Sequence, residues 1–250
     1  MRASKPQDHF FLHLWIMLQD GYRGVERWKG YCDANPSLPL QTNLEHQNSL
    51  NTLFLSALPV IGEVDLNRIM LMQASLVHEL GTLYHEKNQD KHLKELLSFD
   101  EIIKKNLHFF GTGLLDLCRY IYILQYVANE SVTFIGHPWA EEMLKRARKN
   151  SFAEGQVFDA LERLDYVLYA IRCFQECKDV VILKHVYCNQ VKILDGYAKI
   201  IKGFNMWWTK EMSAAAKQFM RRYADIPQPQ DEGGIPAAYA HAVRKGYIKL

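Results

Sequence analysis

The sequence predicts an all-α fold on three observations. Apolar residues recur three and four positions apart along most of its 250 residues, as they do on the buried face of an amphipathic helix. Two short stretches, TNLE at residues 42–45 and SFAE at residues 151–154, match the capping box that opens many helices. No alternation of polar and apolar residues is long enough for a strand, and no strand pattern alternates with a helix pattern.

The periodic pattern divides the N-terminal half into a series of helices. The first covers residues 8–19 and ends before Gly21. The stretch GYCDANPSLPLQ at residues 30–41 is expected to be irregular, because it contains two prolines and no periodicity. Asp65 caps a later helix, whose inner face is formed by Ile69, Met72, Gln73 and Leu76.

Between these two lies the helix that begins at the first capping box. The Thr42 side chain is expected to accept a free backbone N–H, and Glu45 is expected to reach back to the cap. His46 then lies in the first turn, on the same face as Leu50. The buried face continues at helical spacing with Leu53, Phe54 and Ala57.

The C-terminal half continues the helical pattern. Residues 91–128 form two helices joined at a Gly-Thr-Gly turn, and Pro138 fits the first turn of a helix that ends near Asn150. Further helical stretches cover residues 180–203 and 205–223. The second capping box opens a helix whose inward residues are Phe158, Leu161, Leu164, Leu168 and Ile171.

Composition and length bound the domain organisation. With 48% apolar and 23% charged residues, the chain is typical of a soluble globular protein. We expect one helical domain over residues 1–224, followed within residues 225–250 by the linker-like stretch IPQPQDEGGIP and a short terminal segment. No apolar run of eighteen residues and no signal-peptide pattern is present, so neither a membrane span nor secretion is predicted.

Charge and cysteine usage narrow the function classes. A net charge of +2 gives no argument for nucleic-acid or membrane binding, although a local basic patch stays open. The five cysteines are odd in number and form no CxxC pair, which predicts reduced thiols and a cytoplasmic location. A soft-metal site at Cys173, Cys177 and Cys188 is the alternative for these residues.

Three predicted helices carry side chains that can bind one metal ion. His46 lies on one helix, His78 and Glu79 lie at the end of the next, and Asp165 lies inside a later one. Helical bundles build metal sites from side chains that project inward from facing helices. Two imidazoles and two carboxylates without a thiolate favour a single divalent ion such as Mn, Co, Ni, Fe, Zn or Mg.

Each of these residues also has a structural interpretation when it is taken alone. His46 can be a buried histidine that backbone or water satisfies. His78 and Glu79 can be a pair at a helix terminus, where an imidazolium meets the negative end of the dipole. Asp165 can form a salt bridge, with Arg163 or Arg172 as the partner.

The order of these residues resembles the HD-domain metal-dependent phosphohydrolases, and most nearly the subgroup that contains the bacterial 5′-deoxynucleotidases. In that subgroup an Arg-Trp pair precedes the first histidine, as Arg27 and Trp28 do here, and a glutamate stands directly before it, as Glu45 does. The run RIMLMQASLV leads into His78 as in the second family motif. The helix LERLDYVLYAI around Asp165 resembles the last one.

The resemblance covers about residues 21–178 and implies an HD-like helical bundle with extra C-terminal helices. It implies metal-dependent hydrolysis of a small phosphorylated metabolite, with a nucleoside 5′-monophosphate as the leading candidate. It also implies that Arg27 binds the substrate phosphate. The implied metal ligands are His46, His78, Glu79 and Asp165.

Two positions depart from the family pattern. Glu79 stands where the family has an aspartate, and Thr82 stands where the deoxynucleotidases have a glutamate that orients the attacking water. Glu86, another turn on, is the expected catalytic substitute, and activation of the water by the metal alone is the alternative. The alternative is a decayed domain that binds a ligand or partner without hydrolysis. A di-iron oxygenase on the same fold would need further His and Asp ligands between residues 83 and 154.

The sequence also bears on assembly. Two helical regions carry more large aromatic residues than one core of this size needs, and aromatic residues are enriched at protein interfaces. We therefore predict a homodimer. The basic residues near the C-terminus are sparse, so no nucleic-acid partner is predicted. The aromatic residues concerned are Tyr120, Tyr122, Tyr126, Trp207 and Trp208.

Overall fold

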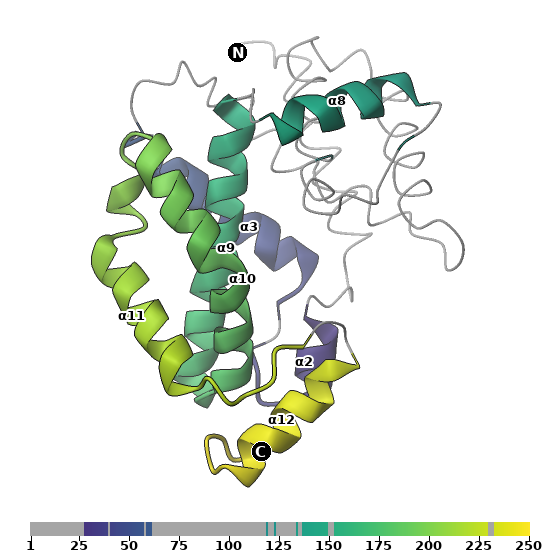
Figure 1. Ribbon diagram of the computed structural model, residues 1–250, viewed down its shortest axis with the longest axis vertical. Coiled ribbons are helices and arrows are strands. Elements are labelled where there is room, and N and C mark those ends of the chain that lie inside the picture. The colour runs from purple at the N-terminus through teal and green to yellow at the C-terminus, as the bar shows by residue number, and fades with distance from the viewer. Residues whose placement is uncertain are drawn as a thin grey trace, which may run out of the picture. The chain divides into compact units, whose positions relative to one another are not determined.

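The computed structural model describes residues 28–39, 41–57, 59–61, 119, 123, 134, 137–149, 153–229 and 233–250 (Figure 1). These residues form seven α-helices and one short 3-10 helix, and none of them belongs to a sheet. The all-α prediction is therefore confirmed for the described part of the chain. No helix in that part is long and apolar enough to cross a membrane.

The described residues fall into two compact units. Leu50–Phe54 and the described residues from 119 to 159 belong to one unit. The other unit contains the described residues from 28 to 49, from 55 to 61 and from 160 to 250. The single domain expected over residues 1–224 stays a prediction.

In the first unit, α8 (Pro138–Arg148) begins and ends as the sequence predicts. Pro138 occupies its first turn, where a missing N–H costs no hydrogen bond. The aromatic rings of Phe54 and Phe158 pack in the same unit, with centroids 5.3 Å apart. The buried face of α8 repeats at intervals of three and four residues, through Ala140, Met143, Leu144 and Ala147.

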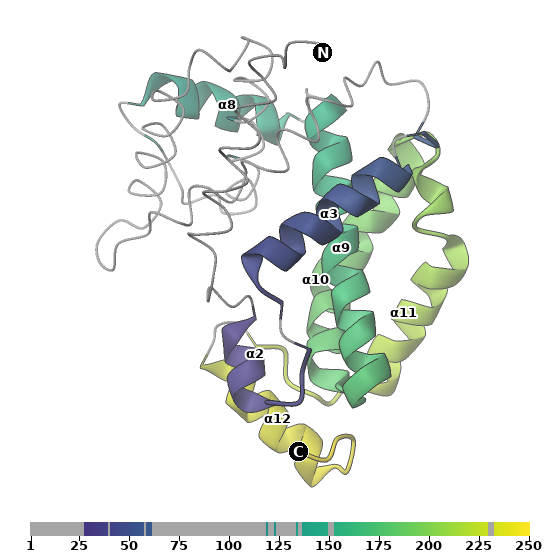
Figure 2. The same cartoon turned by 180° about the vertical axis from the view of Figure 1, so that it is seen from behind.

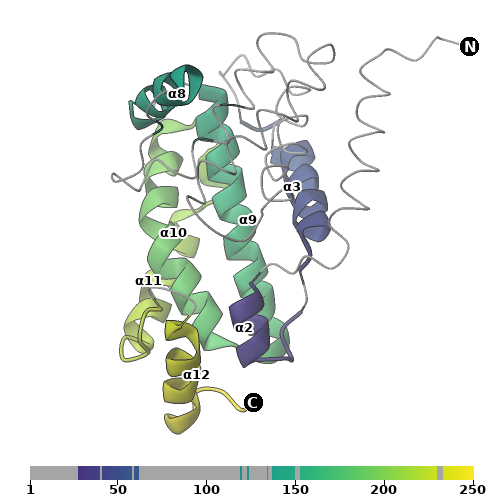
Figure 3. The same ribbon diagram turned by 90° about the vertical axis from the view of Figure 1, so that its right-hand side faces the viewer.

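In the second unit, α10 (Val180–Ile200) runs beside the part of α9 (Ala153–Cys177) that belongs to this unit, residues 160–177 (Figures 1 to 3). Lys178 ends α9 in a left-handed conformation with φ of 58°. Asp179 then caps α10, because its side chain accepts the backbone N–H groups of Val181 and Ile182 at 2.9 and 3.0 Å. Helix α11 (Lys210–Arg222) packs on α10.

The capping box that opens α3 (Asn43–Ala57) is confirmed. The Glu45 carboxylate accepts the N–H of Thr42 at 2.7 Å, and the Thr42 hydroxyl accepts the N–H of Glu45 at 3.2 Å. The predicted buried face is also confirmed, at Leu50, Leu53, Phe54 and Ala57.

The prediction that residues 30–41 are irregular is wrong for the first part of that stretch. Helix α2 (Lys29–Ala34) covers it, and it contacts α12 (Gly234–Arg244), beside which it lies in Figure 2. Tyr31 is 4% exposed, and its ring lies 5.5 Å from that of His185 and 6.2 Å from that of Tyr239. Tertiary burial therefore stabilises a turn and a half that has no periodic signal of its own.

Two other details differ from the prediction. Leu168 is 41% exposed rather than inward, because the buried side of α9 turns toward Tyr169 and Cys173, which are 6% and 0% exposed. The helix expected over residues 205–223 begins only at Lys210. A 3-10 turn, η2 (Phe204–Met206), precedes it, and Gly203 introduces that turn with φ of 84°.

Several predicted elements lie outside the described residues. These are the helices over residues 8–19 and 91–128, the helix capped by Asp65 and the second capping box. They stay predictions.

Candidate metal centre

The structure brings together two of the predicted metal ligands. Nδ1 of His46 on α3 lies 2.8 Å from Oδ2 of Asp165 on α9, although the two residues are 119 positions apart. Both belong to the second unit. Their exposed fractions are 0% and 1%, so the pair is withdrawn from solvent. A buried polar pair of this kind requires hydrogen bonds or a metal ion to offset its lost hydration.

Two neighbours complete this pair, and the sequence reasoning missed both. The Ser49 hydroxyl donates to Oδ1 of Asp165. The Tyr166 ring stacks on the His46 imidazole, with centroids 5.5 Å apart and planes 9° from parallel. Ser49 lies three residues after His46, on the same helix face, so helical spacing was the signal that could have identified it.

Trp28 connects the Arg-Trp motif to this pair. Its ring lies 5.7 Å from that of Tyr166, edge to face, and it stacks on Tyr169 at 5.6 Å. Its indole N–H donates to the Gln41 side chain at 3.1 Å. These contacts hold a non-glycine residue at φ of 63°, an uncommon left-handed conformation. Trp28, the described residue of the Arg-Trp pair, and His46 therefore both pack against the Tyr166 ring.

The donor types and their separation fit adjacent positions on a divalent ion. Metal–nitrogen and metal–oxygen bonds of about 2.0–2.2 Å place neighbouring ligands about 3 Å apart at right angles. The His46–Asp165 distance of 2.8 Å is close to that value. The Ser49 bond to the second carboxylate oxygen is the kind of outer contact that orients a ligand. A purely structural hydrogen bond would have the same length.

The structure describes His46 and Asp165 and none of the other predicted site residues. Within the described part of the chain, no group of three or more His, Cys, Asp or Glu side chains is arranged to hold a metal ion. The other predicted site residues all lie outside the described residues: Arg27, His78, Glu79 and Glu86.

Asp165 does not form the salt bridges considered from the sequence. Among the described residues its partners are His46 and Ser49. Arg163 donates to Gln190 at 2.8 Å, and Arg172 pairs with Glu176 at 2.9 Å. The alternative of an arginine-paired surface carboxylate is therefore wrong for Asp165.

The cysteine alternative also gains no support among the described residues. Burial raises the pKa of the Cys173 thiol to about 12, so the thiolate that a soft metal requires is disfavoured. The Cys177 thiol donates to the carbonyl of Ser37 at 2.7 Å. These contacts are those of structural cysteines.

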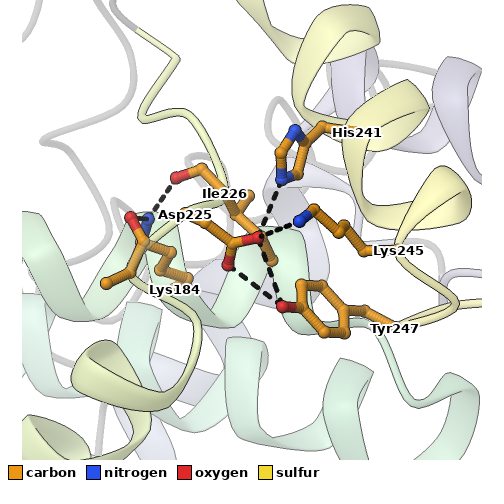
Figure 4. A network of polar contacts seen from close by, with 7 residues as sticks. Lys184, Asp225, Ile226, His241, Lys245 and Tyr247 are labelled. Carbon is orange, nitrogen blue, oxygen red and sulfur yellow. Dashed lines mark hydrogen bonds and ion pairs between the residues drawn. The ribbon is translucent and has the colours of Figure 1, made fainter.

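Two further polar clusters hold the C-terminal elements in place. The buried Lys184 ammonium donates to the carbonyls of Ala224 and Ile226 (Figure 4). Beside it, Asp225 accepts from His241 at 3.0 Å and from Tyr247 at 3.1 and 3.2 Å. The second cluster centres on Asp179, which the sequence analysis did not single out. Neither cluster presents a nucleophile beside a base, so we assign both to structure.

Comparison of the chain with known protein families, with curated proteins and with solved structures finds no match. The resemblance to the HD-domain enzymes therefore rests on the motif residues of this sequence.

Proposed function

We propose that this protein is a metal-dependent phosphohydrolase of the HD type, acting on a small phosphorylated metabolite such as a nucleoside 5′-monophosphate. The observation that supports it most is the buried contact between His46 and Asp165. The sequence pattern selected these two residues as ligands of one ion from separate helices. Their convergence at 2.8 Å is a necessary condition for that role.

In this proposal each motif residue has one role. His46 and Asp165 hold the ion together with His78 and Glu79. Arg27 binds the substrate phosphate through its guanidinium fork, and Glu86 orients the water that attacks phosphorus. A bound divalent ion supplies Lewis acidity toward the phosphoryl group and makes water a stronger nucleophile. Tyr166 and Ser49 keep the first and last ligands in position.

The second candidate is a decayed HD-like domain that binds a ligand or partner without hydrolysis. The replacements Glu79 and Thr82 favour it, since both stand where the resembling enzymes use other residues. The variant Glu79→Asp with Thr82→Glu separates the two cases. Turnover that appears only in this variant identifies a decayed enzyme, and turnover already present in the wild type rejects the second candidate.

Metal binding is tested first, because it does not depend on knowing the substrate. An ion that binds only the folded state at a hundredfold excess over Kd stabilises it by about 2.7 kcal/mol. For a chain of this size that corresponds to a melting temperature lowered by roughly 5–11 °C on chelation. We expect stoichiometric metal in the purified wild type and none in Asp165→Asn or His46→Ala.

The matched control is Asp159→Asn, another largely buried aspartate on α9, which is 8% exposed. It should retain the metal and the response to chelator. Hydrolysis is then measured with Mn, Co, Ni, Fe, Zn and Mg against nucleotides and sugar phosphates. If no metal is found and none of these ions raises the melting temperature, the proposal is rejected and the His46–Asp165 pair is structural.

A further inference from the structure

A histidine on α10 contributes to the packing of α2 and α12. His185 is half-buried, and its ring meets the ring of Tyr31 on α2 edge to face, with centroids 5.5 Å apart. Tyr31 also packs on Tyr239 of α12, with ring centroids 6.2 Å apart. Helix α12 contacts both α2 and α10. Tyr31 therefore joins His185 to the packing of all three helices.

Two buried polar atoms at this junction have no hydrogen-bond partner among the described residues. They are Nδ1 of His185 and the hydroxyl of Tyr31, a residue that is 4% exposed. The two atoms do not bond to each other, although their rings are in contact. Buried polar atoms are nearly always paired, and an exception is often a point of strain or function. For His185 the cost of this exception depends on the protonation state of the ring.

Protonation makes the unpaired nitrogen of His185 much more costly. In the neutral ring Nδ1 can be an acceptor, and the ring carries no net charge. In the imidazolium both nitrogens are donors, so a positive charge and an N–H without an acceptor would be buried together. Burial accordingly lowers the pKa of His185. The packed arrangement therefore favours the neutral ring.

The side chains next to His185 offer no negative charge to an imidazolium. The facing group from α2 is the Tyr31 phenol, which stays neutral because burial raises its pKa above the usual value. The facing group from the segment after α11 is the Gln228 amide, which donates to the His185 carbonyl at 3.5 Å. On α10 itself Lys184 is a cation, and the Cys188 thiol stays protonated because burial raises its pKa.

The carboxylates of this region are engaged elsewhere. Each oxygen of the buried Asp179 accepts two hydrogen bonds. One of these comes from Tyr239 on α12, at 2.8 Å. His241, on the same helix, pairs with Asp225 at 3.0 Å. Among the described residues no ion pair involves His185. A proton on His185 would therefore add an uncompensated charge to the junction.

We propose that His185 makes the packing of α2 and α12 on α10 sensitive to mild acid, so that the two helices dock while the imidazole is neutral and release when it is protonated. The undocked ring should have an ordinary pKa of about 6.5. Docking is therefore strongest above about pH 6.5 and weakens as the pH falls below that value. Helix α2 has only six residues and depends on this packing, and its release would separate Trp28 from the Tyr166 ring. The switch does not depend on the proposed hydrolase activity.

The test is backbone hydrogen exchange of the full chain, read by mass spectrometry between about pH 7.5 and about pH 5 and corrected for the intrinsic rate at each pH. We expect amides in α2 and α12 to lose protection in acid by at least about threefold. The upper limit is about thirtyfold, for a ring that titrates near pH 6.5 only when it is undocked. Asp225 stays ionised over this range, because its pKa is lowered. Among the described residues none in α11 bonds to or stacks on His185, so α11 should keep its protection.

The decisive variant is His185→Phe, which keeps an aromatic ring against Tyr31 but cannot be charged. Its amides in α2 and α12 should show no additional loss of protection in acid. His185→Gln is also neutral and should be equally insensitive, which covers the case in which phenylalanine packs poorly. The matched control is His241→Gln, which removes another histidine of the same unit and should keep the acid response of the wild type.

The acid response of the wild type decides the proposal together with these variants. A response that is the same in the wild type and in both His185 variants overturns it. A wild type without a response overturns it as well. A loss of protection that is as large in α11 is global unfolding and also overturns it.

Discussion

Replacement of Asp179 by alanine is predicted to destabilise the second unit strongly. Its side chain is fully buried and accepts four hydrogen bonds. The Asn35 amide and the Tyr239 hydroxyl donate to Oδ2 at 2.6 and 2.8 Å. The backbone N–H groups of Val181 and Ile182 donate to Oδ1. One carboxylate therefore connects α10, α12 and the segment that follows α2.

The magnitude follows from what the substitution leaves behind. Loss of the cap at the start of α10 costs about 0.5–2 kcal/mol. Two buried side-chain donors, on Asn35 and Tyr239, then lose their acceptor, at about 1–3 kcal/mol each before relaxation. After relaxation of the neutral groups left behind, we expect Asp179→Ala to cost about 3–5 kcal/mol in total.

Tyr239→Phe removes only one of these bonds and should cost about 2 kcal/mol, the usual value for a hydrogen bond to a charged group. Burial raises the pKa of Tyr239, and the nearby Asp179 charge raises it further, so the phenol remains a donor at every working pH. In the Asp179→Ala background the same change should cost much less, because the acceptor is already gone. Tyr247→Phe is the matched control, since it removes a bond to the exposed Asp225.

The assay is urea unfolding followed by far-UV circular dichroism, with the free energy of unfolding taken from the midpoint and slope. Asp179→Ala within about 1 kcal/mol of the wild type would refute the reasoning, since four buried bonds cannot vanish without cost. Equal costs for Tyr239→Phe and Tyr247→Phe would show that burial does not amplify the Asp179 network.

Two further predictions concern backbone strain and pH. Gly203→Ala should lower the free energy of unfolding by more than about 2 kcal/mol in the same assay, because φ is +84° and the new Cβ would lie 2.3 Å from the Val60 carbonyl oxygen. Gly246→Ala should lower it by only about 1–2 kcal/mol, because φ is +69° but the space around the new Cβ is open. The hydrogen bond from His241 is the main reason that the pKa of Asp225 lies below its usual value. The ionised Asp225 carboxylate therefore stabilises the folded protein above about pH 4, and this stabilisation is lost as the pH falls through the lowered pKa. The difference in unfolding free energy between wild type and Asp225→Asn should therefore shrink in acid, and a difference that stays constant down to pH about 2 would contradict this assignment.

Elements with a local signal were predictable from the sequence. The capping box at Thr42 and Glu45 needs only residues three apart, and Pro138 marks the first turn of α8 by its missing N–H. Helix α2 was not predictable, because its stability comes from the burial of Tyr31 against distant residues. The prediction that Leu168 points inward was wrong for a similar reason. Helix α9 is buried on more than one side, so the spacing of its apolar residues does not identify a single inward face.

The candidate site also contains residues that the sequence could predict and residues that it could not. His46 and Asp165 were selected because their residue types and order carry chemical meaning. Ser49 and Tyr166 were not, because their roles depend on how closely α3 approaches α9. The capping role of Asp179 is local, since two of its donors lie two and three residues after it. Its wider role was missed because the other two donors lie 144 residues before it and 60 residues after it, a pattern that no single stretch reveals.

The segment between α2 and α3 explains how two residues so far apart meet at 2.8 Å. An apolar helix face alone tolerates small rotations, because burial energy depends on area and not on direction. Hydrogen bonds are directional, and they fix the segment at its start, middle and end. Helix α3 begins directly after the last of these bonds, so His46 in its first turn lies close to a backbone position that is fixed. A residue held in this way can meet Asp165 with the accuracy that a metal ligand requires. The three bonds join Asn35 to Asp179, the Pro39 carbonyl to Tyr169, and Gln41 to Trp28.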